Sequence, residues 1–175
     1  MWLADPQNGG RSADKRLLHR VLTAPERLLV AVSPEPDAML WSLWAAKEAA
    51  YKAWSRSHSG LFSPASFVVE FAPGLLLARV VKGDWSVAVR WTRGPDWVHA
   101  LAADVPESVV VRVERADGEP SESVRRLAVR EFSGVGGPAA RVIGKPPRLV
   151  WEGGEQAVSL SHDGPYVAVA FHDPA

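Results

Sequence analysis

A carboxylate and an ammonium group stand four residues apart in the segment Trp44–Ala53, which reads WAAKEAAYKA. Residues spaced by three or four share one face of a helix. Glu48 and Lys52 are therefore expected to line up with Trp41 and Trp44, so that this face presents indole surface, one acid and one base. A polyanion that carries a divalent metal ion suits this set, because hard cations prefer carboxylate oxygens and phosphates prefer cationic donors.

The same pair also has a simpler interpretation. A Glu that precedes a Lys by four residues is a common solvent-facing helix pair, and such a pair contributes only about 0.2–0.5 kcal/mol. On this segment alone, a ligand site and a solvated ion pair explain the residues equally well. The rest of the chain has to distinguish them.

Two further segments accompany this helix. Arg20 to Glu26 reads RVLTAPE, and Val158 to Gly164 reads VSLSHDG and is followed by YVAVA. With Trp44 to Lys52, they resemble three signatures of the 4'-phosphopantetheinyl transferase superfamily: R-[IV]-[LF]-T-x-x-E, W-x-x-K-E-A-x-x-K and a C-terminal S-[IL]-S-H hairpin. Their order is that of the short holo-acyl-carrier-protein synthase branch. The resemblance covers roughly residues 3–72 and 156–171.

The resemblance implies an enzyme, a holo-[acyl-carrier-protein] synthase, that transfers 4'-phosphopantetheine from coenzyme A to a serine of an apo acyl or peptidyl carrier protein. The reaction needs charge neutralisation at the phosphates and a base for the serine proton. The resemblance makes Glu48 the Mg²⁺ ligand and a catalytic residue, and Lys52 a catalytic residue that contacts coenzyme A. It places Ser161 and His162 among the residues that bind coenzyme A, and it implies lipid biosynthesis as one setting and a homo-oligomer.

Lys47 and Glu26 also match the family, but the sequence favours structural roles for both. Thr23-Ala24-Pro25-Glu26 has the pattern of a capping box, which by itself explains Glu26, and Lys47 is expected to support its helix. Basic residues concentrate just before this point and would suit an acidic carrier protein: Arg11, Lys15, Arg16 and Arg20. A solvated helix face explains them equally well.

The chain departs from the family at its start. Family members begin with a strand that ends in G-x-D, whose aspartate is a second magnesium ligand, whereas this chain begins MWLADP and offers Asp5 as its first carboxylate. Three explanations compete: the start lies upstream of Met1, Asp5 substitutes, or the chain is a degenerate member that only binds coenzyme A or a carrier protein. We favour a shortened start, because the remaining signature is intact.

Composition narrows the class of protein. The chain has 175 residues, of which 47% are hydrophobic, and this suits one globular domain, 1–175. Twenty basic and twenty acidic residues cancel, which argues against a dedicated nucleic-acid binder. No cysteine is present, which fits a cytoplasmic protein, and no apolar run predicts a membrane span.

The pattern along the chain predicts an α+β fold of helices packed on an antiparallel sheet. Asp14, Thr23 and Ser121 are the expected helix caps. Helices are predicted over about 15–21, 37–56 and 121–132. Strands are predicted over 67–71, 75–81, 85–91, 97–102, 109–114, 157–161 and 166–171, and Pro146-Pro147 is expected to introduce a further strand before the last two. The first five strands look like one meander, and those over about 75–115 exceed what the shortest synthases contain.

Three rival interpretations are weak. Ser161-His162-Asp163 suggests a hydrolase, but neighbours on a strand point to opposite faces and cannot form a triad together. The glycine pairs lack the strand-to-helix context of a phosphate-binding loop. His19, His58, His99 and His172 show no paired metal spacing, so zinc is not expected.

Overall fold

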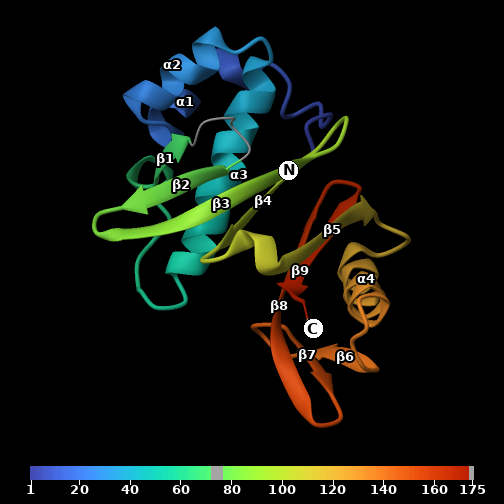
Figure 1. The fold of residues 1–175 in the computed structure, drawn as a ribbon. Helices are drawn as coiled ribbons and strands as arrows, with labels where there is room; N and C mark the ends of the chain where they lie inside the picture. Colours follow the sequence, from blue (N-terminus) through green and yellow to red (C-terminus); the bar gives the residue numbers. More distant parts are fainter. Residues whose placement is uncertain (72–76, 174–175) are drawn as a thin grey trace. The chain divides into compact units, whose positions relative to one another are not determined.

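The computed structural model describes residues 1–71 and 77–173 (Figure 1). Contacts between residues divide the chain into two compact units, Met1–Pro106 and Glu107–Ala175. The expectation of a single domain stays a prediction. Both units combine helices with an antiparallel sheet, which confirms the α+β class.

Five helical segments open the first unit: η1 (Arg11–Ala13), α1 (Lys15–Val21), α2 (Ala24–Val32), α3 (Pro36–Trp54) and η2 (Pro64–Ser66). Asp14 caps α1 as predicted, since its Oδ1 accepts the amide of Leu17 at 3.0 Å. Glu26 accepts the amide of Thr23 at 2.7 Å, as the capping box predicts. Pro36 starts α3, a position where its missing N–H costs nothing.

The sheet of the first unit is a four-stranded meander in the order β1-β2-β3-β4. Its strands are β1 (Val68–Phe71), β2 (Leu77–Lys82), β3 (Trp85–Arg93) and β4 (Val98–Ala103). The predicted strand over 75–81 begins outside the described residues. Met1–Leu3 extends along β4, with Met1 and Val98 exchanging backbone hydrogen bonds of 2.8 and 2.9 Å.

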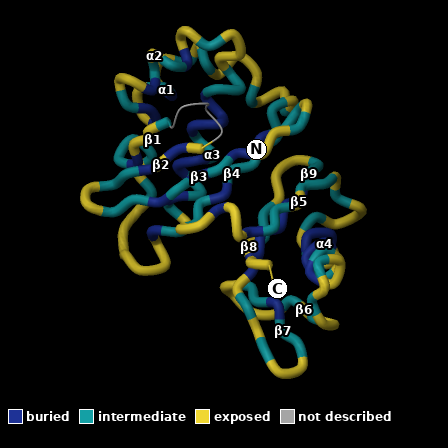
Figure 2. The backbone as a smooth tube through the Cα atoms, viewed as in Figure 1, coloured by how far each residue is buried: buried dark blue, intermediate teal, exposed yellow. Residues whose placement is uncertain are grey.

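Helix α3 crosses one face of this sheet (Figure 1). Alternate residues of β3, among them Val87, Val89 and Trp91, face the core, as the period of two in a strand requires. Leu43 and Ala46 of α3 are fully buried against them. The buried positions run along α3 and the strands in Figure 2. One side of α3 is therefore committed to the core, and its other side is left to carry a site.

The second unit contains η3 (Pro106–Ser108) at its boundary and then β5 (Val109–Arg115), α4 (Pro120–Gly134), β6 (Ala140–Ile143), β7 (Arg148–Trp151), β8 (Gly154–Asp163) and β9 (Tyr166–His172). The sheet order is β5-β9-β8-β7-β6, all antiparallel, and α4 packs on β8 and β9. Phe132 and Phe171 meet in its core at 5.7 Å between ring centroids. Among the described residues, no helix is long and apolar enough to cross a membrane.

Three expectations for this region need correction. The predicted fifth strand of the meander, β5, pairs with β9 instead, since strand partners are chosen by packing and not by order in the chain. Glu119, and not Ser121, caps α4, because the Glu119 carboxylate accepts the Glu122 amide at 2.9 Å. Strand β6 (Ala140–Ile143) was not predicted from the sequence.

Candidate active site

Glu48 and Lys52 lie together on the solvent side of α3. The Lys52 Nζ and Glu48 Oε1 atoms are 3.0 Å apart, and their side chains are 60% and 41% exposed. The spacing therefore places the acid and the base as predicted. An ion pair this exposed contributes at most about 1 kcal/mol to stability. A bound anion can therefore take Lys52, and a bound cation can take Glu48, at little cost in free energy.

The predicted aromatic face is only partly present. Trp44 is half-buried and meets the Phe62 ring at 5.7 Å between centroids. Trp41 is buried, and its Nε1 donates to the backbone oxygen of Asn8 at 3.0 Å. The N-terminal loop covers the start of α3, so Trp41 does not line the candidate site; helix spacing predicts the direction of a side chain but not what covers it.

Lys47 points into the protein and supports α3. Its Nζ donates to Glu26 Oε2 at 2.7 Å and to the backbone oxygens of Phe67 and Pro64 at 2.6 and 3.2 Å. Burial lowers the pKa of Lys47, and the Glu26 carboxylate raises it in part. The three bonds use all donors of the ammonium group.

Glu26 is equally well satisfied. Beyond Lys47, its carboxylate accepts the amides of Thr23 at 2.7 Å and Val69 at 2.9 Å. The Glu26 and Lys47 side chains are 1% and 0% exposed. This buried ion pair therefore joins α2, α3 and β1, in line with the supporting roles expected for both residues. The sequence did not show that they bind each other.

The loop after α3 returns along the helix and packs on its aromatic side chains. The Phe62 ring stacks on Tyr51 at 4.8 Å, and the Tyr51 hydroxyl donates to the Gly60 oxygen at 3.2 Å. Gly60 has a φ of +154°, and a Cβ there would lie 2.9 Å from the Trp54 ring. Sequence reasoning missed Tyr51 and Phe62; the glycine was the available signal, since such a position favours a residue without a side chain.

His99 on β4 is a second residue that the motifs do not reveal. Burial, and then the positive charges of the N-terminus, Lys52 and Arg90, lower the pKa of His99 to about 4. Its Nδ1 is buried and makes no hydrogen bond to any part of the chain that the structure describes. The imidazole is thus neutral at pH 7 and is influenced by the charge of Lys52.

Asp5, the candidate replacement for the family aspartate, and Asp37 at the start of α3 both accept backbone amides of the N-terminal segment. Asp5 Oδ1 accepts the Gln7 amide at 2.8 Å within its own loop. Asp37 accepts the amides of Gly10 and Ser12, both at 2.7 Å; burial opposes its ionisation, but these bonds from Ser12 and Gly10 leave the pKa of Asp37 lowered. Within residues 1–71 and 77–173, no three His, Asp or Glu side chains gather as a metal cluster.

Ser161 and His162 lie on β8 of the second unit, opposite Ala168 and Val167 of β9. The β8–β9 hairpin turns through Gly164, whose φ is +53°, as the Asp-Gly-Pro sequence predicts. Ser161 is half-buried and His162 is exposed. The structure thus presents the imidazole to solvent near the turn, while Glu48 and Lys52 form their own pair on α3.

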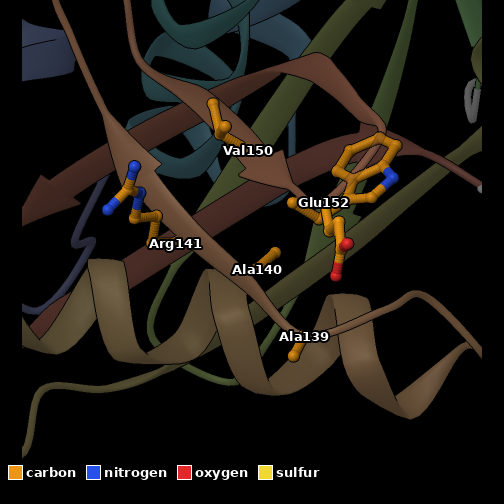
Figure 3. Close-up of a pocket in the computed structure, with 6 residues that line it drawn as sticks. Ala139, Ala140, Arg141, Val150 and Glu152 are labelled. Carbon is orange, nitrogen blue, oxygen red and sulfur yellow. The ribbon is translucent and has the colours of Figure 1, made fainter.

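The second unit also has an open hollow of about 440 Å³ (Figure 3). It is lined by Ala139, Ala140, Arg141, Val150, Trp151 and Glu152. The Arg141 and Glu152 side chains lie toward opposite ends of it in Figure 3. None of the predicted site residues lines this hollow, so it does not take part in the candidate active site.

Comparison with known proteins identifies the class. The model of the 4'-phosphopantetheinyl transferase superfamily, named ACPS, matches residues 4–102, which is more than half of the chain. The chain belongs to the 4'-phosphopantetheinyl transferase superfamily. No curated protein and no solved structure matches the chain. The matched residues include Glu48 and Lys52, and they end before Ser161 and His162.

Proposed function

We propose that the chain is a holo-[acyl-carrier-protein] synthase that transfers 4'-phosphopantetheine from coenzyme A to a serine of an apo acyl or peptidyl carrier protein. The observation that carries this proposal is the exposed Glu48–Lys52 pair within the matched residues. The buried Lys47–Glu26 pair one residue away holds the helix that displays it.

The proposed reaction is a phosphoryl transfer. The serine oxygen forms a bond to the phosphorus next to the pantetheine arm, the bond from that phosphorus to the bridging oxygen breaks, and 3',5'-adenosine bisphosphate leaves. Lys52 would donate to the phosphates and offset the charge that shifts to the leaving oxygen. Glu48 is the candidate to accept the serine proton, directly or through water.

Glu48 also suits a Mg²⁺ site. Mg²⁺ is commonly held by one or two carboxylates, water and substrate phosphates, and the half-exposed Glu48 carboxylate meets that requirement. The ion would neutralise charge on the pyrophosphate. When the substrate binds, the Lys52 ammonium would leave the Glu48 carboxylate and bind a phosphate instead. Breaking the exposed ion pair costs little free energy, because the pair is weak.

The binding of coenzyme A is proposed to use Ser161 and His162 as well. The exposed imidazole near the turn can donate to a phosphate, and the turn amides add donors. Arg11, Lys15, Arg16 and Arg20 are all exposed on η1 and α1, which supports docking of an acidic carrier protein there. We also propose a cytoplasmic homo-oligomer; a purely monomeric sedimentation profile would contradict the oligomer.

The alternative is a binding module. If Asp5 does not replace the family aspartate, the chain could bind coenzyme A or a carrier protein without transferring the group. The Asp5 carboxylate accepts the Gln7 amide within its own loop. This bond favours the binding module over a chain in which Asp5 replaces the family aspartate. Retained coenzyme A binding without turnover, unaffected by Glu48→Ala, would establish it.

The test is intact-mass spectrometry of an apo carrier protein incubated with the chain, Mg²⁺ and coenzyme A. We expect a mass gain equal to phosphopantetheine, reduced at least 100-fold in rate by Glu48→Ala or Lys52→Ala. Glu70→Ala, which removes an exposed carboxylate from β1, is the matched control and should leave the rate unchanged. No mass gain, or a full rate with Glu48→Ala, would refute the proposed catalytic site.

A further inference from the structure

The outer edge of β4 is only partly paired. Strand β4 lies at the end of the first sheet, and Met1–Leu3 runs antiparallel along its beginning. Met1 and Val98 exchange two backbone hydrogen bonds, and the Leu3 amide donates to the Asp96 oxygen at 2.7 Å. This pairing stops at Met1 and Val98, whereas β4 continues to Ala103. The last part of the strand therefore extends past its neighbour on this side.

The bonds to Met1 also fix the direction of the remaining backbone groups. In an antiparallel ladder, the N–H and C=O groups of one residue point to the same side, and successive residues alternate. Val98 points to Met1, so Ala100 and Ala102 point outward as well, while Leu101 points to β3. No part of the chain that the structure describes hydrogen-bonds to these outward groups of Ala100 and Ala102. Such a row of backbone donors and acceptors is a template for another strand.

The edge of β4 also lacks the charges that usually protect an edge strand. Proteins commonly place charged side chains on such strands, where they discourage pairing with another chain. The other edge strands of the two sheets follow this rule, with the exposed Glu70 in β1, Arg112 in β5 and Arg141 in β6. The one ionisable side chain of β4 is His99, which is neutral at pH 7. Nothing on β4 repels a second strand by its charge.

We propose that a second copy of the chain pairs with this edge, β4 against β4, about a two-fold axis. In the antiparallel register centred on Leu101, Ala100 of one copy lies opposite Ala102 of the other, so each outward N–H meets an outward C=O. Both side chains are small and uncharged, and the contact uses the same surface on both copies. It would join the two four-stranded sheets into one. The inference gives the proposed homo-oligomer an interface and does not depend on the transfer reaction.

The length of the open edge favours a second copy over a longer strand from another protein. A longer strand would run into Met1, which already occupies the edge beside Val98. In the two-fold register, Ala103 of the copy lies opposite His99. Strand β4 ends there, one residue before it would reach the position of Met1. Self-pairing therefore uses all the open backbone groups and displaces nothing.

Sedimentation velocity between about 1 and 500 μM tests the dimer, since small interfaces dissociate in this range. The chain should carry any tag at its C-terminus. Ala102→Pro removes an outward N–H, which an edge strand tolerates because its ladder to β3 stays intact. We expect the dissociation constant of the dimer to rise about tenfold or more. Ala140→Pro at the first residue of the edge strand β6 is the matched control and should leave it within twofold.

Two further measurements keep the inference testable if Ala102→Pro fails to fold. Amide exchange of Ala100 and Ala102 should slow about tenfold on going from a dilute to a concentrated wild-type sample. Four residues joined before Met1 would continue along the same edge, so this lengthened chain should be monomeric. A monomeric wild-type chain, or a dimer unchanged in the lengthened chain or in folded Ala102→Pro, would overturn the inference. Transfer by a monomer would leave the proposed reaction intact, and a dimer without transfer would leave this interface intact.

Discussion

Consecutive residues of one motif have opposite surroundings in this protein. Lys47 is completely buried and saturated with bonds, whereas Glu48 is half-exposed and its pairing with Lys52 is weak. A helix turns by about 100° per residue, so two consecutive residues point in different directions. Lys47 can therefore support the fold while Glu48 faces solvent. This division makes the two lysines of the motif experimentally distinguishable.

Lys47→Met should lower the free energy of unfolding by about 3–5 kcal/mol, because it leaves the buried Glu26 carboxylate without its cation. Lys52→Met should change it by less than about 1 kcal/mol, since that pair is exposed. Urea unfolding measures both. Adding Glu26→Gln to Lys47→Met should restore part of the loss; a loss equal to that of Lys52→Met would show that the buried pair is unimportant for stability.

His99 predicts a pH dependence of stability. Its pKa of about 4 in the folded chain lies below the ordinary value of 6.5, so between these values the unfolded chain binds a proton that the folded chain does not. The free energy of unfolding should therefore fall as the pH drops below 6.5, by about 2 kcal/mol at pH 5. Stability present at pH 7 is lost on acidification.

Urea unfolding of His99→Gln across pH 5–7 provides the comparison. Carboxylates titrate in both proteins, so the difference between the two curves isolates the imidazole. We expect a shallower dependence in the variant. Parallel curves would mean that His99 titrates alike in the folded and unfolded chains.

At the scale of elements, the helices follow their local signals closely. The structure ends α3 at Trp54 where the pattern predicted about Arg56, and Asp14 and Glu26 make the predicted capping bonds. Helix bonds and caps join residues three or four apart, so the local sequence determines them. The cap of α4 was assigned two residues late, because both Glu119 and Ser121 can accept an amide.

The loop after α3 depends on Gly60. Gly60→Ala should loosen it, since the backbone there has a positive φ and the added methyl group would press on the Trp54 ring. We expect faster amide hydrogen exchange in residues 57–63, with exchange in α3 itself unaffected. Gly83→Ala in the β2–β3 turn is the control for backbone strain alone. Gly83 also has a positive φ, but a Cβ added there would contact no neighbouring atom.

At the scale of the whole molecule, the net charge does not describe how the charges are distributed. The chain is neutral overall, yet Arg11, Lys15, Arg16 and Arg20 are exposed close together in the sequence. The double variant Arg16→Glu/Arg20→Glu should raise the carrier KM at least tenfold and leave coenzyme A binding intact, because charge reversal repels an acidic partner.

The salt dependence of carrier binding checks this surface. Electrostatic attraction between exposed charges is screened at high ionic strength, so the wild-type carrier KM should rise with salt more steeply than that of the double variant. Equal slopes would place the electrostatic contact elsewhere. Lys82→Glu is unsuitable as a control, because the Lys82 ammonium lies over the Trp54 and Phe67 rings at 5.1 and 4.6 Å.

The sequence by itself determined the helices, most strands, the α+β class, the family and the Glu48–Lys52 pair, because each depends on residues close together or on a contiguous motif. Tertiary structure decided the rest. It buried Trp41 under the N-terminal loop, joined Lys47 to Glu26, lowered the pKa of His99 and moved β5 into a second sheet. These features depend on contacts between distant residues, and packing selects such contacts only when the whole chain has folded.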